Sequence, residues 1–353
     1  MKDCRKKWIV VLILLLTNFS KAGRILFDFT KSETAGNADW VVDHDYPYPL
    51  PAQPSSPTSW DGAISSWGYR LYSYGHEVAT LIPSYGITYA NSSNPFDLSN
   101  FDVFIMVEPQ NPLSIGEREA ILNYISNGGG FLMIADHNSS DRDGDGWDSP
   151  RVLNNAFEST LGVHFNITGE RPNSYSGVST NILRDQENLI YNGPFGCVQS
   201  LGFWSGTCAV LNPGVNPSVF GLVWVPGAMQ DHDSVMFFFG YFGNGRFAGM
   251  GDSSPCDDGT GNPSDNLYDN WSMYSDSVLI LNATLWLMEG SSKVEEKAHK
   301  SSFSTILKVS EASQKSKEGI IFYDILGREV LPLKEGLYFI NRSKGVIERV
   351  IVR

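Results

Sequence analysis

The sequence predicts an α/β domain with a mostly parallel sheet, helices on both faces and a β-rich insertion, followed by a small β module. Three observations predict this class. Short apolar runs alternate with amphipathic segments, as in parallel sheets with crossover helices. The central apolar run, Phe131 to Ala135, is short and bounded by turns, as a strand buried on both faces would be. A hydrophobic content of 42% and an aromatic content of 12% support a real core.

The first half of the chain supplies four strands and two helices in alternation. Expected strands are Arg24–Phe29, Glu77–Ile82, Asp102–Glu108 and the central run. A helix is expected over 59–75, with Ser59 as its N-cap. A second helix is expected over 113–127, where Ser114 and Glu117 have the spacing of a capping box.

The second half continues this pattern around an insertion. A helix over 150–162 has its proline at the start. Residues 163–227 are rich in Gly, Asn and Ser and predict an insertion of hairpins. Strands Ser234–Tyr241 and Arg246–Gly251 are expected to pair through an AsnGly turn. Met273–Met288 is the final amphipathic helix.

Charge is distributed unevenly along the chain, whose formal net charge is −13. Residues 23–292 hold nine Lys/Arg and 30 Asp/Glu, which gives −21 for the main domain. Such a surface repels phosphate backbones, so nucleic acid is not an expected partner. Cations and neutral polar ligands such as sugars suit it better.

The chain is expected to divide into four parts. Basic residues before the apolar run Trp8–Leu16, and the SerLysAla site that follows, predict a secretory signal over 1–22. The apolar run is too short to span a bilayer comfortably, so no transmembrane segment is expected after cleavage. Residues 23–290 form the α/β domain, 291–302 a linker rich in Ser, Lys and Glu, and 303–353 a β module.

Three cysteines would remain after cleavage. In an oxidising compartment a local disulfide between Cys197 and Cys208 is plausible. Cys256 is then left over, as a bystander thiol or, less commonly, as a nucleophile.

Two segments carry chemistry at predicted strand ends. The loop after the central strand holds Asp136, His137 and Asn138, then Asp141-x-Asp143-x-Asp145-Gly146, the spacing of a calcium loop without its twelfth-position Glu. Calcium or another divalent cation is one interpretation, and a solvated acidic turn is the other. The candidate metal ligands are Asp141, Asp143, Asp145, Asp148, Asp257 and Asp258.

The carboxyl ends of parallel strands share one edge, where ligands gather in open α/β sheets. We therefore expect the two acidic loops, 136–148 and 252–269, to open there together. So many carboxylates would repel one another unless cations or raised pKa values relieve them. The candidate ligand-binding residues are Glu33, Asp39, Glu108, Asn138, Trp147, Asp265 and Asp269.

His137 is the first candidate for a general base or metal ligand, with Asp136 and Asp252 beside it. A structural histidine that holds a neighbouring aspartate is the alternative. Ser253 with His137 and an aspartate would imitate a hydrolase triad, although no Gly-x-Ser-x-Gly elbow is present.

The main domain resembles the class I glutamine amidotransferase-like superfamily, in its non-amidotransferase branches. The resemblance lies in the helix, glycine turn and strand over 113–134, the late strand GRFAGMGDSSP over 245–255, and the closing helix with NATLWL over 282–287. It implies a flavodoxin-like sheet. The family's nucleophilic cysteine is replaced by Ala135-Asp136-His137-Asn138, so glutaminase activity is not expected.

The tail resembles the type A C-terminal sorting domain of the type IX secretion system. The matching residues are FYDILGREV over 322–330, GLYFI over 336–340 and the closing VIVR. The resemblance implies export by that machinery, with release from a bacterium or retention on its outer-membrane surface. The module is expected to be a small β-sandwich-like unit, and a β module of immunoglobulin type without a sorting role is the alternative.

Taken together, the residues predict a secreted or surface protein that binds or processes an extracellular polar ligand at an acidic, cation-binding pocket. Carbohydrate is the leading ligand class, because Trp40, Trp60, Trp147 and Trp271 fall in loops near the expected site. A metal-dependent hydrolase using Asp136, His137 and Asp252 is the first alternative. A non-catalytic envelope scaffold is the second, so the sequence leaves open whether the protein is an enzyme.

Overall fold

The computed structural model describes residues 22–170, 172–261 and 269–300, and four strands beyond them. The chain divides into two compact units, Met1–Ser291 and Ser292–Arg353. The signal segment expected over 1–22 lies outside the described residues apart from its last residue, and Asp265 lies outside them too. Among the described helices, none is long and apolar enough to cross a membrane.

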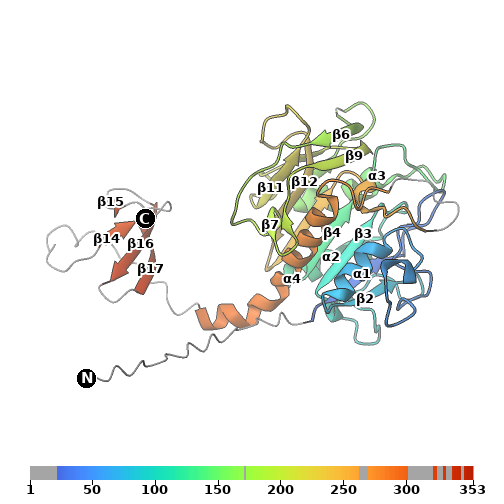
Figure 1. The fold of residues 1–353 in the computed structure, drawn as a ribbon, viewed down its shortest axis with the longest axis horizontal. Helices are drawn as coiled ribbons and strands as arrows, with labels where there is room; N and C mark the ends of the chain where they lie inside the picture. Colours follow the sequence, from blue (N-terminus) through green and yellow to red (C-terminus); the bar gives the residue numbers. More distant parts are fainter. Residues whose placement is uncertain are drawn as a thin grey trace, which may run out of the picture. The chain divides into compact units, whose positions relative to one another are not determined.

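A nine-stranded sheet forms the centre of the first unit (Figure 1). Its strands follow the order β2-β1-β3-β4-β13-β12-β10-β5, with β11 beside β12. The five strands from β2 to β13 are parallel, and the rest are antiparallel. The bounds are β1 Arg24–Asp28, β2 Glu77–Leu81, β3 Val103–Val107, β4 Gly130–Ile134, β5 Val163–Phe165, β10 Ala209–Leu211, β11 Val219–Trp224, β12 Val235–Phe242 and β13 Gly245–Met250. The predicted α/β class is confirmed.

The central strands are buried on both faces, as their continuous apolar sequences require. Every residue of β3 and of β4 is buried. A glycine begins β4 because the helix behind it comes very close: a Cβ on Gly130 would lie 2.7 Å from the backbone oxygen of Leu287. The glycine-rich turn before this strand therefore has a packing role.

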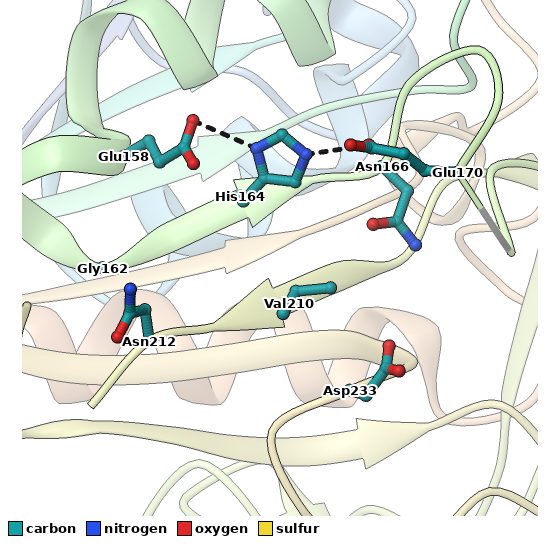
Figure 2. A pocket seen from close by; sticks show the side chains of 8 residues that line it. All are labelled: Glu158, Gly162, His164, Asn166, Glu170, Val210, Asn212 and Asp233. Atoms are coloured by element: carbon teal, nitrogen blue, oxygen red, sulfur yellow. Dashed lines mark hydrogen bonds and ion pairs between the residues drawn. The ribbon is translucent and has the colours of Figure 1, made fainter. Parts of the chain in front are cut away.

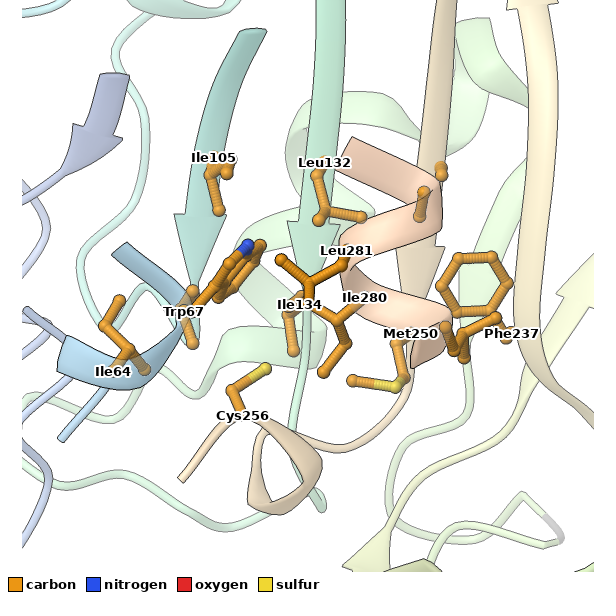
Figure 3. Close-up of a cluster of buried hydrophobic side chains, with 14 of the residues drawn as sticks. Ile64, Trp67, Ile105, Leu132, Ile134, Phe237, Met250, Cys256, Ile280 and Leu281 are labelled. Atoms are coloured by element: carbon orange, nitrogen blue, oxygen red, sulfur yellow. The ribbon is translucent and has the colours of Figure 1, made fainter. Parts of the chain in front are cut away.

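Helices cover both faces of the sheet. The bounds are α1 Ser65–Ser73, α2 Ile115–Ser126, α3 Ser149–Leu161 and α4 Asp276–Lys300. One hydrophobic cluster packs α1 and α4 on alternate strand residues such as Ile105 and Leu132 (Figure 3). The other packs α2 and α3 on the intervening residues, such as Phe104 and Phe131. This alternation follows from the two-residue period of a strand.

Helix ends agree with the sequence in some places only. The Ser114–Glu117 capping box at α2 is present, with Ser114 N–H donating to Glu117 Oε2 at 2.7 Å. α1, however, begins at Ser65 and not at Ser59. The reason is tertiary: Asp258 accepts from Ser66 N–H at 2.6 Å, so a distant carboxylate satisfies the first turn.

The insertion is β-rich, as predicted, and part of it joins the main sheet. Two small pairs stand apart: β6 (Tyr175–Ser179) with β9 (Leu201–Gly206), and β7 (Asn192–Gly193) with β8 (Gly196–Cys197). Cys197 and Cys208 are both free thiols, so the local disulfide is not formed. Cys208 instead lies in the core, with its Sγ 3.4 Å from Met236 Sδ.

The second unit contains one antiparallel sheet in the order β15-β14-β16-β17. Its strands are β14 Ile321–Tyr323, β15 Glu329–Val330, β16 Gly336–Arg342 and β17 Val346–Val352. They coincide with the segments whose residues resemble a sorting domain. Between the units, α4 continues to Lys300, so most of the predicted linker is helical.

Candidate functional site

The parallel strands bring four acidic residues to one edge of the sheet. Asp28 ends β1 and Glu108 follows β3. Asp136 comes two residues after the end of β4, and Asp252 two residues after the end of β13. Each of the four carboxylates is at most 3% exposed. We call Glu108, Asp136 and Asp252, with Arg142 and Ser253 between them, the carboxyl-edge cluster. The sequence predicts the meeting of these acids, but not how deeply they are buried.

Glu108 accepts hydrogen bonds from three side chains of distant segments. Arg142 binds both carboxylate oxygens, with its Nη2 3.2 Å from Oε2. Trp40 Nε1 donates to Oε2 at 2.6 Å, and Ser253 Oγ at 3.0 Å. Burial, reinforced by the nearby Asp136, raises the pKa of Glu108 to about 7 although Arg142 opposes the shift. The residue also has a φ of 49°, a costly conformation outside glycine.

Asp136 connects this buried network to a partly exposed imidazole. Its Oδ2 accepts from Arg142 Nη2 at 3.1 Å and lies 3.0 Å from His137 Nδ1. The side chain of His137 is 37% exposed, and no described residue bonds its Nε2. The hydrogen bond that His137 donates to Asp136 raises the pKa of His137, against the effect of burial. A carboxylate thus orients an imidazole whose outer nitrogen can exchange a proton.

Asp252 is held by backbone donors from both sides. Trp204 N–H and Ser254 N–H both donate to its carboxylate. Burial first, and then the charge of Asp136, raise the pKa of Asp252 to about 8. Ser253 is 1% exposed and donates to Glu108, and no hydrogen bond to His137 is found among the described residues. A Ser–His–Asp arrangement is therefore not assembled here.

Glu33 joins Asp28 in a separate buried pair. Glu33 is 0% exposed and accepts from Lys31 N–H at 2.8 Å. Burial raises the pKa of Asp28 to about 6, and burial together with Asp28 raises that of Glu33 well above its ordinary value. Glu33 has the environment of an internal group and offers no surface to a ligand.

Asp39 is also buried and holds a second histidine. Its Oδ1 lies 3.0 Å from His44 Nε2, while His44 Nδ1 lies 2.9 Å from Asp61 Oδ1. These carboxylates raise the pKa of His44 although burial opposes them. Both ring nitrogens are occupied, so this histidine is a structural link between 39–46 and Asp61.

The acidic loop brings three of its predicted ligands together. Atoms of Asp141, Asp143 and Asp145 lie within 4.8 Å of one another, the one such group among the described residues. Asn111 Nδ2 donates to Asp143 at 2.7 Å, and Asp141 accepts from Gly144 N–H at 2.8 Å. Oxygen ligands at this spacing suit a hard cation such as calcium.

The other three candidate metal ligands are used elsewhere in the described structure. Asp148 caps α3, accepts from Ser139 N–H at 2.9 Å and pairs with Arg151. Asp258 caps α1, as described above, and Asp257 accepts from Gly259 N–H at 2.9 Å in a turn. Their carboxylates are not part of the Asp141 group.

The predicted aromatic and amide contacts have a mixed outcome. Trp40 and Trp60 are 1% and 3% exposed and belong to the core. The indole N–H of Trp40 donates a hydrogen bond to Glu108. Trp147 is partly exposed in the acidic loop. Asn138 bonds Thr168 and Asn173 of the next loop. The exposed Asp269 pairs through its backbone with Asp258, so it lies beside α1.

Arg142 is the site residue that the sequence reasoning missed. It stands between two aspartates, and its side chain turns inward to Glu108, Asp136 and Asn37. A signal was present, because Arg142 is the one basic residue between Gly128 and Ser149 apart from His137. A lone cation in an acidic loop beside buried carboxylates is a candidate counter-ion.

Comparisons with known proteins give fold similarity alone. No family model matches the chain, and no curated protein does. A solved cytoplasmic protein from Salmonella typhimurium has 13% identity and a TM-score of 0.45, covering 75% of this chain and 98% of that one. A ThuA-like protein from Bacteroides uniformis has 14% identity and a TM-score of 0.38, covering 77% and 94%. One from Parabacteroides merdae has 12% identity and a TM-score of 0.41, covering 76% and 91%.

ThuA-like proteins belong to the class I glutamine amidotransferase-like superfamily, which the sequence resembles. With TM-scores below 0.5, these similarities carry no argument about family membership or activity. The α/β class rests on the order and direction of the strands themselves.

Proposed function

We propose that the first unit binds or processes a polar ligand at the carboxyl edge of its sheet, with His137 as the residue that meets the ligand. One observation carries the proposal: buried Asp136 holds Nδ1 of a His137 whose side chain is 37% exposed. The hydrogen bond to Asp136 raises the pKa of His137 and so favours its protonated form. Glu108 binds the guanidinium of Arg142, and Arg142 in turn binds Asp136. These contacts hold the carboxylate that orients the imidazole.

A neutral polar ligand, with carbohydrate as the first class to test, fits the charge of the site. Residues 23–292 carry −21, which disfavours anions. Of the four candidate tryptophans, Trp40 and Trp60 are buried, and the partly exposed Trp271 stacks on Trp67 of the core. The aromatic argument for sugars therefore rests mainly on the partly exposed Trp147. Export to the outer-membrane surface or the medium, by the type IX machinery, remains part of the proposal and rests on the sequence patterns.

Glutaminase chemistry is not part of the proposed function. No cysteine follows β4, where the resembled family places its nucleophile. Burial raises the pKa of the Cys208 thiol to about 12 and that of Cys256 well above its ordinary value. Neither thiol is a thiolate at neutral pH, so neither is a good nucleophile.

The variants His137→Ala and Asp136→Asn distinguish the proposal from its two alternatives. The matched control is His232→Ala, because His232 is an exposed histidine outside the carboxyl-edge cluster. The assays are retention on neutral oligosaccharide resins and hydrolysis of nitrophenyl glycosides and esters.

If the two site variants are retained more weakly on the resins than the wild type, and neither the wild type nor any variant shows turnover, the unit is a binding module. Turnover lost by about 10²-fold in both site variants, with unchanged melting, supports the hydrolase. If the site variants change only the melting temperature, the site is structural, and a non-catalytic scaffold replaces the proposed function.

We also propose a calcium or other divalent ion in the loop of Asp141, Asp143 and Asp145. The observation that favours it is the close approach of three carboxylates, which repel one another unless a cation lies between them. Because Arg142 belongs to the same loop, an ion there would also steady the guanidinium that holds Asp136. Elemental analysis of the purified protein tests this directly.

A further inference from the structure

A cavity of about 480 Å³ lies outside the carboxyl-edge cluster and shares no residue with it. It opens beside β5 and β10, at the antiparallel end of the sheet, and Val210 lies in its wall (Figure 2). This volume is in the range of small-molecule sites. The polar side chains around it come from α3, from β5 and the loop that follows it, from Asn212 just after β10, and from Asp233.

His164 bridges two of the carboxylates that line this cavity. Its Nδ1 lies 3.0 Å from Glu158 Oε2, and its Nε2 lies 2.8 Å from Glu170 Oε2 (Figure 2). These carboxylates raise the pKa of His164 although burial opposes them. The imidazole meets Oε2 of each glutamate, and no described residue bonds Oε1 of Glu158 or of Glu170.

Asn166 supplies an independent sign that the cavity takes a ligand. The residue is 2% exposed, and its Nδ2 donates to the Pro172 carbonyl at 3.0 Å. Among the described residues, nothing donates to its Oδ1, and Figure 2 shows this oxygen on the side of Val210. This oxygen opens to the cavity, where a ligand N–H or O–H can take the place of water.

Asp233 adds a third carboxylate to the lining. Its Oδ1 accepts from Ser234 N–H at 2.6 Å, and its Oδ2 has no partner among the described residues. Two carboxylates approach the imidazole of His164 and a third, that of Asp233, lies elsewhere in the lining, which gives the cavity excess negative charge. The complementary ligand is positively charged and carries several donors.

A single metal ion does not fit this lining. Within the described residues, only Asp141, Asp143 and Asp145 bring three ligand atoms within 4.8 Å of one another. The carboxylates of Glu158, Glu170 and Asp233 are therefore too far apart to share one ion. A larger cation with donors at several points can reach them separately.

We propose that this cavity binds an organic cation with ammonium or guanidinium groups, whose methylene chain would pack on Val210. The ligand is either a free amine or a lysine or arginine side chain of a peptide, since both present the same chemistry. The proposal does not depend on the function proposed for the carboxyl-edge cluster.

Calorimetric titration of the full-length protein at low salt tests this, with putrescine, arginine amide and a Gly-Lys-Gly peptide as probes. Butane-1,4-diol is the neutral control for putrescine. Asp233→Asn removes one lining charge while keeping the oxygen that accepts from Ser234. Its matched control is Asp185→Asn, an exposed carboxylate that also accepts from a turn N–H but lies outside the cavity.

We expect saturable binding of at least one cationic probe, none of the diol, and affinity about threefold weaker in Asp233→Asn alone. Tighter binding of the peptide than of putrescine would point to a protein-borne amine, and the reverse to a free one. No saturable binding, equal binding of the diol, or equal loss in both variants would overturn the proposal. So would stoichiometric calcium binding that Asp233→Asn abolishes.

Discussion

Arg142 and Asp136 are joined across the acidic loop, with Arg142 Nη2 3.1 Å from Asp136 Oδ2. The same oxygen lies 3.0 Å from Nδ1 of His137. A guanidinium and an imidazole thus share one carboxylate oxygen, and the guanidinium also holds Glu108. This link connects the loop of Asp141, Asp143 and Asp145 to His137, the partly exposed imidazole beside the carboxyl-edge cluster.

Replacing Arg142 by glutamine is expected to destabilise the protein strongly. The Arg142 side chain is 10% exposed and Glu108 is 0% exposed, so the change leaves buried carboxylates without their counter-ion. Such losses cost about 3 kcal/mol of the free energy of unfolding. Urea unfolding at pH 7 measures the change.

Arg151→Gln is the matched control for Arg142→Gln. Its ion pair with Asp148 has an arginine side chain that is 38% exposed, and exposed pairs contribute about 1 kcal/mol or less. Equal losses in the two variants would mean that Arg142 is an ordinary surface residue.

Stability should fall as the pH rises from about 4 to about 8. Burial raises the pKa of Asp276 from 3.8 to about 8, with Asp252 adding to the shift and Gly202 N–H opposing it. Between these values the native state keeps a proton that the unfolded chain has lost. The contribution is therefore fully present at low pH and disappears above about 8.

Asp276→Asn should make this pH dependence less steep, because the neutral amide does not titrate while Asp252 and Glu108 still do. One proton corresponds to about 1.4 kcal/mol per pH unit within the window. Unfolding free energies of the wild type, of Asp276→Asn and of the exposed control Asp269→Asn at pH 5 and pH 8 measure it. An unchanged slope in Asp276→Asn would show that Asp276 is ionised in the native state.

The acidic loop should make stability depend on calcium. A ligand that binds only the native state adds about 2.7 kcal/mol at one hundred times its Kd. Added calcium should raise the melting temperature, relative to chelator, of the wild type and of the control Asp185→Asn. The same comparison should show a much smaller rise for Asp143→Asn. Elemental analysis without bound metal, together with identical curves, would leave the loop as a solvated turn.

The thiols should differ in their reactivity in the native state. Cys197 is partly exposed, whereas Cys208 and Cys256 are buried with raised pKa values. Iodoacetamide at pH 7.5, followed by peptide mass spectrometry, should label Cys197 first and the other two only after denaturation. Rapid native labelling of Cys256 would reopen the possibility of a cysteine nucleophile.

The sheet and its acidic edge could be predicted because they depend on local patterns. Continuous apolar runs such as Phe131–Ala135 identify buried strands without any tertiary information. Once the strands are known to be parallel, Glu108, Asp136 and Asp252 must share an edge. The capping box of Ser114 and Glu117 is equally local.

What the sequence did not reveal depends on contacts between distant segments. In the sequence, Asp258 and Asp148 look like cation ligands. In the structure, their carboxylates accept hydrogen bonds from backbone N–H groups in the first turns of α1 and α3. Trp40 looks like a loop aromatic, but its indole N–H satisfies Glu108 in the core. Arg142 escaped notice because nothing local shows that its side chain points inward.

The most direct test of the proposed site is the titration of His137 followed by NMR at its imidazole Cε1–H. We expect the pKa of His137 to lie above 6.5 in the wild type, because its hydrogen bond to Asp136 raises it. In Asp136→Asn the pKa should fall, while His232→Ala should leave it unchanged. A wild-type pKa at or below 6.5 that Asp136→Asn does not alter would contradict the claim that Asp136 orients and charges His137.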